Sequence, residues 1–180
     1  MGNGVGCALV LFMMLTAGFP VSTVLSKEGM KVDALKISSP VFENNGQMPE
    51  KYTCDGIDVN PPLIIENVPV GTKSLALIVD DPDAPRGTWV HWVVWNIDPK
   101  TVEIREHNIP KGALQGMNDF EKRDYGGPCP PSGTHRYFFK LYALDTLLNF
   151  SSEAGKAGLE KAMQGHIIGQ AQIVGRYKRK

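Results

Sequence analysis

Three carboxylates and two prolines stand together between two apolar runs of the chain. Asp80, Asp81 and Asp83 follow an uncharged apolar run, and a second apolar run starts at Val90 with His91 as its next residue. A carboxylate beside an imidazole supports acid–base chemistry, or it orients and charges the histidine for anion binding. These residue types therefore indicate a polar pocket at the edge of an apolar core.

A second stretch, residues 126–144, has the same design. A loop of sequence GGPCPPSGT leads into an apolar run that begins at His135. Alternate residues of a strand share a face, so His135 is expected on the face of Tyr137 and Phe139, with Arg136 on the opposite face. A histidine again heads an apolar face directly after a proline-rich loop.

Strands must position both histidines. The apolar runs are rich in β-branched and aromatic residues, which favour strands, and the prolines of DDPDAP make the connection between the first two runs a rigid turn. With a period of two, Asp81 shares a face with Val79, and His91 shares a face with Val93 and Trp95. An acid and an imidazole are then expected at adjoining strand ends.

The motifs DPDAP, HWVVWNI and GGPCPPSGTHRYFFKLYAL together resemble the phosphatidylethanolamine-binding protein family, most closely its bacterial and archaeal Raf kinase inhibitor-like branch. The resemblance covers residues 37–176. It implies a mainly β fold of Greek-key antiparallel sheets with small peripheral helices. It also implies a protein that binds a small anion or phospholipid headgroup, such as phosphate or phosphorylethanolamine, without catalysis or cofactor. Because the family includes inhibitors, inhibition of a protease or kinase through the surface around the pocket is the alternative.

The resemblance also implies which residues form the pocket. We expect Asp81 to line it and to orient a histidine, and Asp83 to brace the loop. A small anion is expected to bind through imidazolium groups and through backbone N–H groups of the Gly/Pro loop. As in similar proteins, the Ala84–Pro85 peptide bond is expected to be cis. The expected ligand-binding residues are Asp81, Asp83, Pro85, His91, Gly127, Cys129, Pro130, His135 and Tyr137.

Charge and motif content exclude several other functions. The 19 basic residues balance the 19 acidic residues. The chain therefore lacks the excess of positive charge that is typical of nucleic-acid-binding proteins. The chain has no GxSxG elbow, phosphate loop or HExxH motif, and the spacing of Asp81, His91 and His135 is not that of a metal site. We therefore expect no metal, no cofactor and no enzymatic activity.

The first 26 residues carry no charged side chain, and most of residues 5–25 are apolar. This composition, with Gly18 and Pro20 in its second half, is typical of a secretory signal peptide followed by one domain over residues 27–180. The alternative is an uncleaved membrane anchor over residues 5–25. A cleaved signal predicts an exported protein, periplasmic or extracellular.

The cysteines fit export. Cys7 lies in the leader, which leaves Cys54 in YTCDG and Cys129 in GGPCPP. Neither belongs to a CxxC pair, so a zinc site is disfavoured. An even number of cysteines in an exported chain is the pattern of a disulfide, and we predict that Cys54 and Cys129 lie close together and are able to bond.

The remaining periodicity predicts many short strands, a late helix and no second domain. The expected strands, besides those already named, are 31–39, 63–66, 74–79, 101–105 and 167–177, and the expected helix is 151–164.

Export gives the first testable prediction. Intact-mass measurement of the protein purified from its native cell envelope or culture medium is expected to give a chain that starts near Lys27. A full-length chain recovered from the soluble cytoplasm would contradict the prediction.

Overall fold

The computed structural model describes residues 1–2, 34–149, 151, 153 and 155–180. The chain divides into two units, residues 1–31 and residues 32–180, and the second contains every element discussed below. The predicted signal peptide over residues 1–26 lies almost wholly outside the described residues and stays a prediction. Among the described residues, no helix has the length and apolar character needed to span a membrane.

The unit is mainly β, as predicted. Its elements are β1 (Lys36–Ser38), β2 (Gly46–Gln47), the short 3-10 helix η1 (Glu50–Tyr52), β3 (Leu63–Glu66), β4 (Ser74–Asp81), β5 (Trp89–Ile97), β6 (Glu103–Ile104), β7 (Leu114–Gln115), β8 (His135–Leu144), α1 (Gly155–Met163) and β9 (Ile167–Tyr177).

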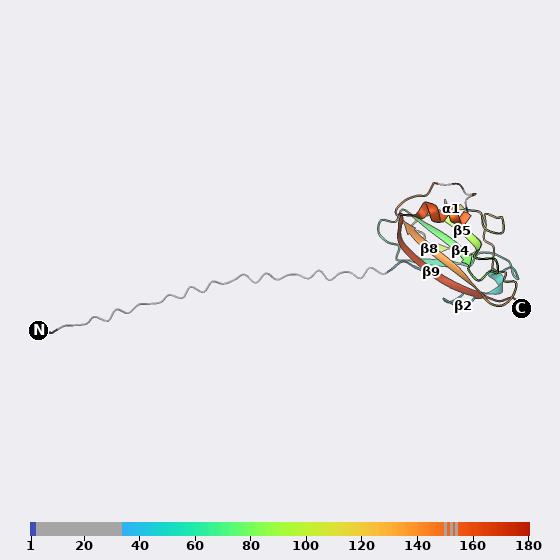
Figure 1. Ribbon diagram of the computed structural model, residues 1–180, viewed down its shortest axis with the longest axis horizontal. Helices are drawn as coiled ribbons and strands as arrows, with labels where there is room; N and C mark the ends of the chain where they lie inside the picture. The colour runs from blue at the N-terminus through green and yellow to red at the C-terminus, as the bar shows by residue number, and fades with distance from the viewer. Residues whose placement is uncertain (3–33, 150, 152, 154) are drawn as a thin grey trace. The chain divides into compact units, whose positions relative to one another are not determined.

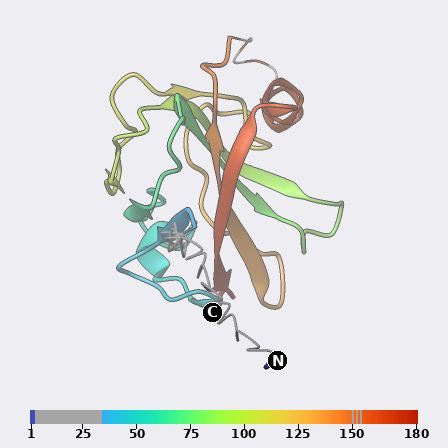
Figure 2. The same ribbon diagram turned by 90° about the vertical axis from the view of Figure 1, so that its left-hand side faces the viewer.

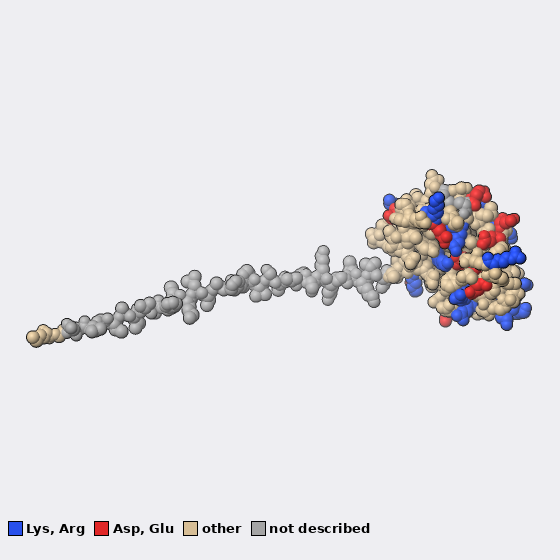
Figure 3. Space-filling view, viewed as in Figure 1, with Lys and Arg blue, Asp and Glu red and all other residues tan. Residues whose placement is uncertain are grey.

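Two sheets form the framework. The larger has the order β2-β9-β8-β4-β5-β7 and the smaller the order β1-β3-β6. Neighbouring strands are antiparallel except β2, which pairs with β9 in parallel. Figure 1 shows β9, β8, β4 and β5 side by side, and Figure 2 shows the end of β9 next to the segment that contains η1. On the face shown in Figure 3, acidic and basic side chains are interspersed.

Apolar side chains cover both faces of β4, and all eight of its residues are buried. Leu75, Leu77 and Val79 pack toward the smaller sheet, in the main core. Ala76 and Ile78 point the other way, into a second core that α1 covers (Figure 1). A strand enclosed on both faces explains why the run 75–79 is continuously apolar rather than alternating.

The predicted strands 63–66 and 167–177 are confirmed with the expected bounds, and the helix begins at Gly155 rather than at residue 151. Three elements were missed: β2, β7 and η1. Each has two or three residues, which is too short for a period to show in the sequence. Their positions depend on partners elsewhere in the chain, β9 for β2 and β5 for β7.

The last two residues of β4 are aspartates that point to opposite faces of the sheet. Asp80 is fully buried on the side of the second core. Lys140 of β8 lies 2.8 Å from its carboxylate and Lys156 of α1 lies 2.6 Å from it. Removing one partner of a buried ion pair leaves the other charge uncompensated, so this cluster ties α1 to the large sheet.

This cluster gives a prediction about stability. Asp80→Asn is expected to lower the free energy of unfolding by about 3 kcal/mol, because two partly buried ammonium groups lose their counter-charge. Urea unfolding followed by circular dichroism measures the change. Glu66→Gln, which breaks the exposed Lys36–Glu66 pair, is the control and should change the midpoint little. Equal effects of the two substitutions would contradict the role of Asp80.

Candidate functional site

A cavity of about 260 Å³ lies where β4, β5 and β8 meet the Gly/Pro loop. Most of the predicted site residues line it, while Asp83, Gly127 and Pro130 do not. Its lining residues are Asp81, Ala84, Pro85, Trp89, His91, Phe120, Cys129, Pro131, His135 and Tyr137.

Asp81 reaches the cavity through the alternation of β4. It follows Asp80 and therefore points toward the main core, as its parity with Val79 predicted. Its side chain is almost completely buried and both oxygens are used. Oδ1 accepts a hydrogen bond from the backbone N–H of Asp83 at 2.8 Å, and Oδ2 accepts one from Nδ1 of His135 at 2.7 Å. Asp81 thus orients His135, as expected.

His91 reaches the same cavity through an irregularity of β5. Val79 is opposite Trp92 and Asp80 is opposite Val90, so His91 is an extra residue, a β-bulge. The bulge places its ring against Tyr137, with ring centroids 5.1 Å apart, on the side of the main core.

The prediction that His91 shares a face with Val93 and Trp95 is therefore wrong, because those two side chains pack in the second core. A period of two does not continue through a bulge, in which two successive residues face one partner residue.

The His91 ring is held by the neighbouring loop. Its Nδ1 donates a hydrogen bond to the carbonyl oxygen of Gly126 at 2.6 Å. Only 3% of the residue is exposed. Burial lowers the pKa of His91, an effect that outweighs the opposing effects of the Gly126 carbonyl and of nearby aspartates. His91 is thus a neutral imidazole at neutral pH.

β8 behaves as its alternation predicted. His135, Tyr137 and Phe139 are buried on one face, and Arg136 points outward. The Tyr137 hydroxyl is buried and has no hydrogen-bond partner among the described residues, although the Cys129 N–H lies near enough to lower the pKa of the phenol slightly. Burial raises that pKa strongly overall, so the hydroxyl keeps its proton.

Sequence reasoning missed Trp89 and Phe120, which supply much of the apolar lining. Their rings meet edge to face at 5.5 Å, and Phe120 meets His91 in the same way at 5.3 Å. Trp89 heads β5, where its aromatic character was a usable signal. Phe120 lies in a segment without periodicity and gave none.

The Gly/Pro loop forms a wall through Cys129 and Pro131. The expectation that backbone N–H groups of this loop are available to an anion is wrong for its two glycines, and it stays a prediction for Cys129, whose N–H lies near the Tyr137 hydroxyl. The Gly126 N–H donates to the His91 carbonyl oxygen, and the Gly127 N–H donates to Asp58 Oδ1 at 2.6 Å. Prolines at three further positions have no N–H to offer. The loop therefore contributes shape more than hydrogen-bond donors.

Asp83 braces the turn after β4 instead of lining the cavity. Its carboxylate accepts Nε and a terminal nitrogen of Arg136 at 2.9 and 2.6 Å. These hydrogen bonds hold the pKa of Asp83 below its usual value.

The prediction of a cis Ala84–Pro85 bond is wrong, since the described residues contain no cis peptide bond. The chain reverses direction through Gly87, whose φ is 103° and whose N–H donates to the Ala84 carbonyl oxygen. A turn with glycine at the left-handed position has no need of a cis proline.

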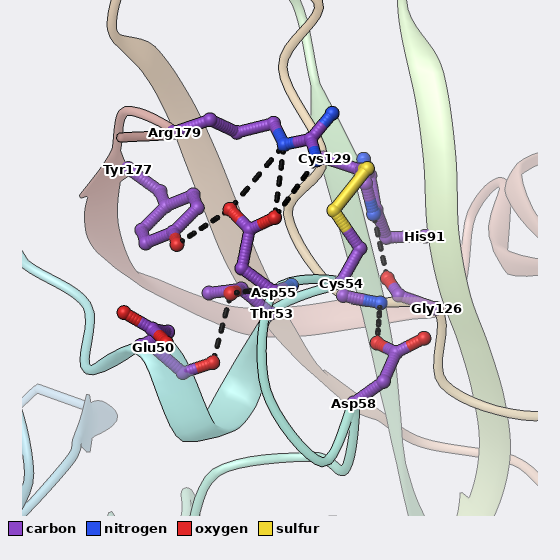
Figure 4. Close-up of a disulfide and its surroundings, with 11 residues drawn as sticks. Glu50, Thr53, Cys54, Asp55, Asp58, His91, Gly126, Cys129, Tyr177 and Arg179 are labelled. Atoms are coloured by element: carbon purple, nitrogen blue, oxygen red, sulfur yellow. Dashed lines mark hydrogen bonds and ion pairs between the residues drawn. A yellow bond between two sulfur atoms is a disulfide. The ribbon is translucent and has the colours of Figure 1, made fainter.

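Cys54 and Cys129 form a disulfide, with Cα atoms 5.4 Å apart (Figure 4). The bond joins the cavity wall to the loop that follows η1. The Cys54 N–H also donates to the Pro128 carbonyl oxygen. In Figure 4, Asp55 next to Cys54 accepts hydrogen bonds from Tyr177 and Arg179, so the end of β9 braces the same loop.

A second, more polar cavity of about 380 Å³ is lined in part by Tyr125 and Asp58. Asn60, His107 and Asp124 also line it. Its hydrogen-bonding side chains serve the loops around it, for example Asn60, which bonds to the backbone of Arg105 and Asn108. The cavity beside His135 holds the buried, unpartnered hydroxyl and is the stronger candidate site.

A two-sheet β framework with a buried Asp–His pair in an aromatic cavity defines the class of this protein. Residues 38–178 match the phosphatidylethanolamine-binding protein family, and the chain belongs to that family.

Relatives in archaea and bacteria confirm the resemblance found in the sequence. The chain is 47% identical to a UPF0098 protein of Methanothermobacter thermautotrophicus, over 81% of this chain and 99% of the relative. Among solved structures it is similar to a putative phosphatidylethanolamine-binding protein homolog of Chlamydia trachomatis, with 39% identity, a TM-score of 0.79 and coverage of 82% and 99% of the two chains. It is also similar to YbcL of E. coli, with 32% identity, a TM-score of 0.77 and coverage of 82% and 100%.

The disulfide gives a prediction about stability. It closes a loop of 75 residues, and the loss of chain entropy in the unfolded state is worth about 4 kcal/mol. The double variant Cys54→Ser, Cys129→Ser is expected to unfold at a lower urea concentration than the oxidised protein. Adding a dithiol reductant should shift the oxidised protein toward the double variant and leave the variant unchanged. An unaltered midpoint on reduction would contradict the prediction.

Proposed function

We propose that this protein binds a small organic phosphate, of the kind found in phospholipid headgroups, in the cavity between β4, β5 and β8. The observation that carries the proposal is the buried Tyr137 hydroxyl, which has no partner among the described residues and lies beside the Asp81–His135 pair. An unsatisfied buried hydroxyl costs about 1–3 kcal/mol. A ligand oxygen that accepts from Tyr137 recovers this energy, which gives binding a driving force.

The shape of the cavity supports a ligand larger than a bare ion. Its polar groups are few, and Trp89, Phe120, Pro85 and Pro131 provide apolar walls. Binding pockets for small molecules combine a mostly apolar lining with a few placed polar groups. The name of the family records phosphatidylethanolamine, and the headgroup of that lipid is an organic phosphate of this size.

Binding rather than catalysis suits the residues that line the cavity. They include no serine, threonine or lysine, and Cys129 is held in the disulfide. Asp81 and His135 resemble part of a catalytic triad, but the described lining supplies no serine or threonine hydroxyl and no free thiol as its third member.

NMR titration with phosphorylethanolamine and with inorganic phosphate tests the proposal. The expected shifts are at His135 and Tyr137, and His135→Ala is expected to weaken binding at least tenfold, because a hydrogen-bonding group of the cavity is lost and Asp81 loses its partner. His166→Ala is the matched control, since His166 forms an exposed pair with Asp145 at the same kind of distance, 2.8 Å. Shifts confined to other residues would place the ligand outside this cavity. Equal binding by both variants would exclude His135 from the binding site.

A further inference from the structure

The tautomer of His91 follows from its partner. The Gly126 carbonyl oxygen accepts hydrogen bonds and cannot donate, so Nδ1 of His91 must carry a proton to make the 2.6 Å bond. In the neutral ring, Nε2 then has a free lone pair. Nε2 has no protein partner among the described residues, and His91 lines the cavity. The ring therefore offers an acceptor to a ligand.

The surroundings of His91 keep it in that state. Phe120 and Tyr137 pack edge to face against the ring. The charged groups that influence it are carboxylates, Asp81 and Asp80 on β4 and Asp58 in the loop after η1. They favour protonation, but burial outweighs them.

The other polar groups of the cavity have fixed roles. Both oxygens of Asp81 are occupied by the Asp83 N–H and by His135, so this carboxylate has little left for a ligand. The Tyr137 hydroxyl retains its proton and can donate a hydrogen bond to a ligand. The polar end thus offers an acceptor at His91 and a donor at Tyr137, with a second donor at His135 when that ring is charged.

We infer that the cavity selects a phosphate monoester or phosphonate in its monoprotonated form over the dianion and over a phosphodiester. This inference rests on the proposed function and specifies its ligand class. A monoprotonated phosphate has a P–OH group that donates to His91 Nε2 and unprotonated oxygens that accept from Tyr137. The dianion and the diester have no P–OH group. In each of them a phosphate oxygen that can only accept would face Nε2 of His91, which is also an acceptor, so no hydrogen bond forms. The ligand is then a released headgroup or another monoester, since a phospholipid still attached to its glycerol is a diester.

A series of three small ligands tests this inference on the wild-type protein. Methyl phosphate, methylphosphonate and dimethyl phosphate are titrated by NMR or calorimetry between pH 5 and 8. The affinity for methyl phosphate is expected to fall at least tenfold between pH 5.5 and 7.5, since its second proton leaves near pH 6. For methylphosphonate, which loses that proton at higher pH, the midpoint should move upward. Dimethyl phosphate should bind at least tenfold more weakly than methyl phosphate at pH 5.5.

The phosphonate separates ligand protonation from histidine protonation. If a protein group alone determined the pH dependence, methyl phosphate and methylphosphonate would share one midpoint, and the inference would be overturned. Equal binding of the diester and the monoester would overturn it as well. Absence of binding by all three ligands at every pH would overturn the proposed function itself.

A matched variant assigns the selectivity to His91. His91→Asn retains an amide N–H near the position of Nδ1, able to donate to Gly126, and removes the acceptor at Nε2. Its preference for methyl phosphate over dimethyl phosphate is expected to fall to less than threefold, with thermal unfolding close to that of the wild type. A full preference in a folded variant would exclude His91 as its source. Should the variant fail to fold, the ligand series on the wild type decides alone.

Discussion

Two adjacent buried carboxylates at the end of β4 are the constraint on which the rest of the structure depends. Burying a charge is costly unless it is paired and hydrogen-bonded, and a strand with both faces covered has no water to solvate Asp80 or Asp81. Each face must therefore supply its own partner. One face supplies two lysines and recruits α1, and the other supplies His135 and becomes the polar end of the cavity. A single dipeptide thereby sets both the packing of the helix and the chemistry of the site.

Much of this arrangement could be predicted from the sequence, and the reason lies in β4 and β8. Both strands keep a strict period of two at the site, so parity predicts the strand faces of Asp81, His135 and Tyr137, and the family resemblance predicts that these faces meet in a pocket. The long motifs also predicted that the chain belongs to the phosphatidylethanolamine-binding protein family, which the comparisons confirm. The cysteine pair was found because few cysteines were available and both stood in loops.

The parts that could not be predicted depend on contacts between distant segments. The bulge at His91 appears only when β5 is aligned against β4, because β5 by itself reads as a regular strand. Phe120 reaches the cavity by packing on Gly126, where a Cβ atom would lie 2.5 Å from its ring. The N–H groups of Gly126 and Gly127 are not available to an anion for a similar reason, because they donate to His91 and Asp58, which are far away in sequence.

The pairing of β2 with β9 determines when the domain can complete its folding. The Asn45 N–H bonds to the Val174 carbonyl oxygen and the Met48 N–H bonds to that of Arg176, across almost the whole described unit. Contacts of such long separation form late, because the intervening chain must first be ordered. A ribosome or a translocation pore that still holds residue 170 therefore holds a chain whose outer sheet edge is open. If the chain is exported, this topology delays complete folding until β9 has crossed the translocation pore, so the chain stays unfolded enough to pass through it.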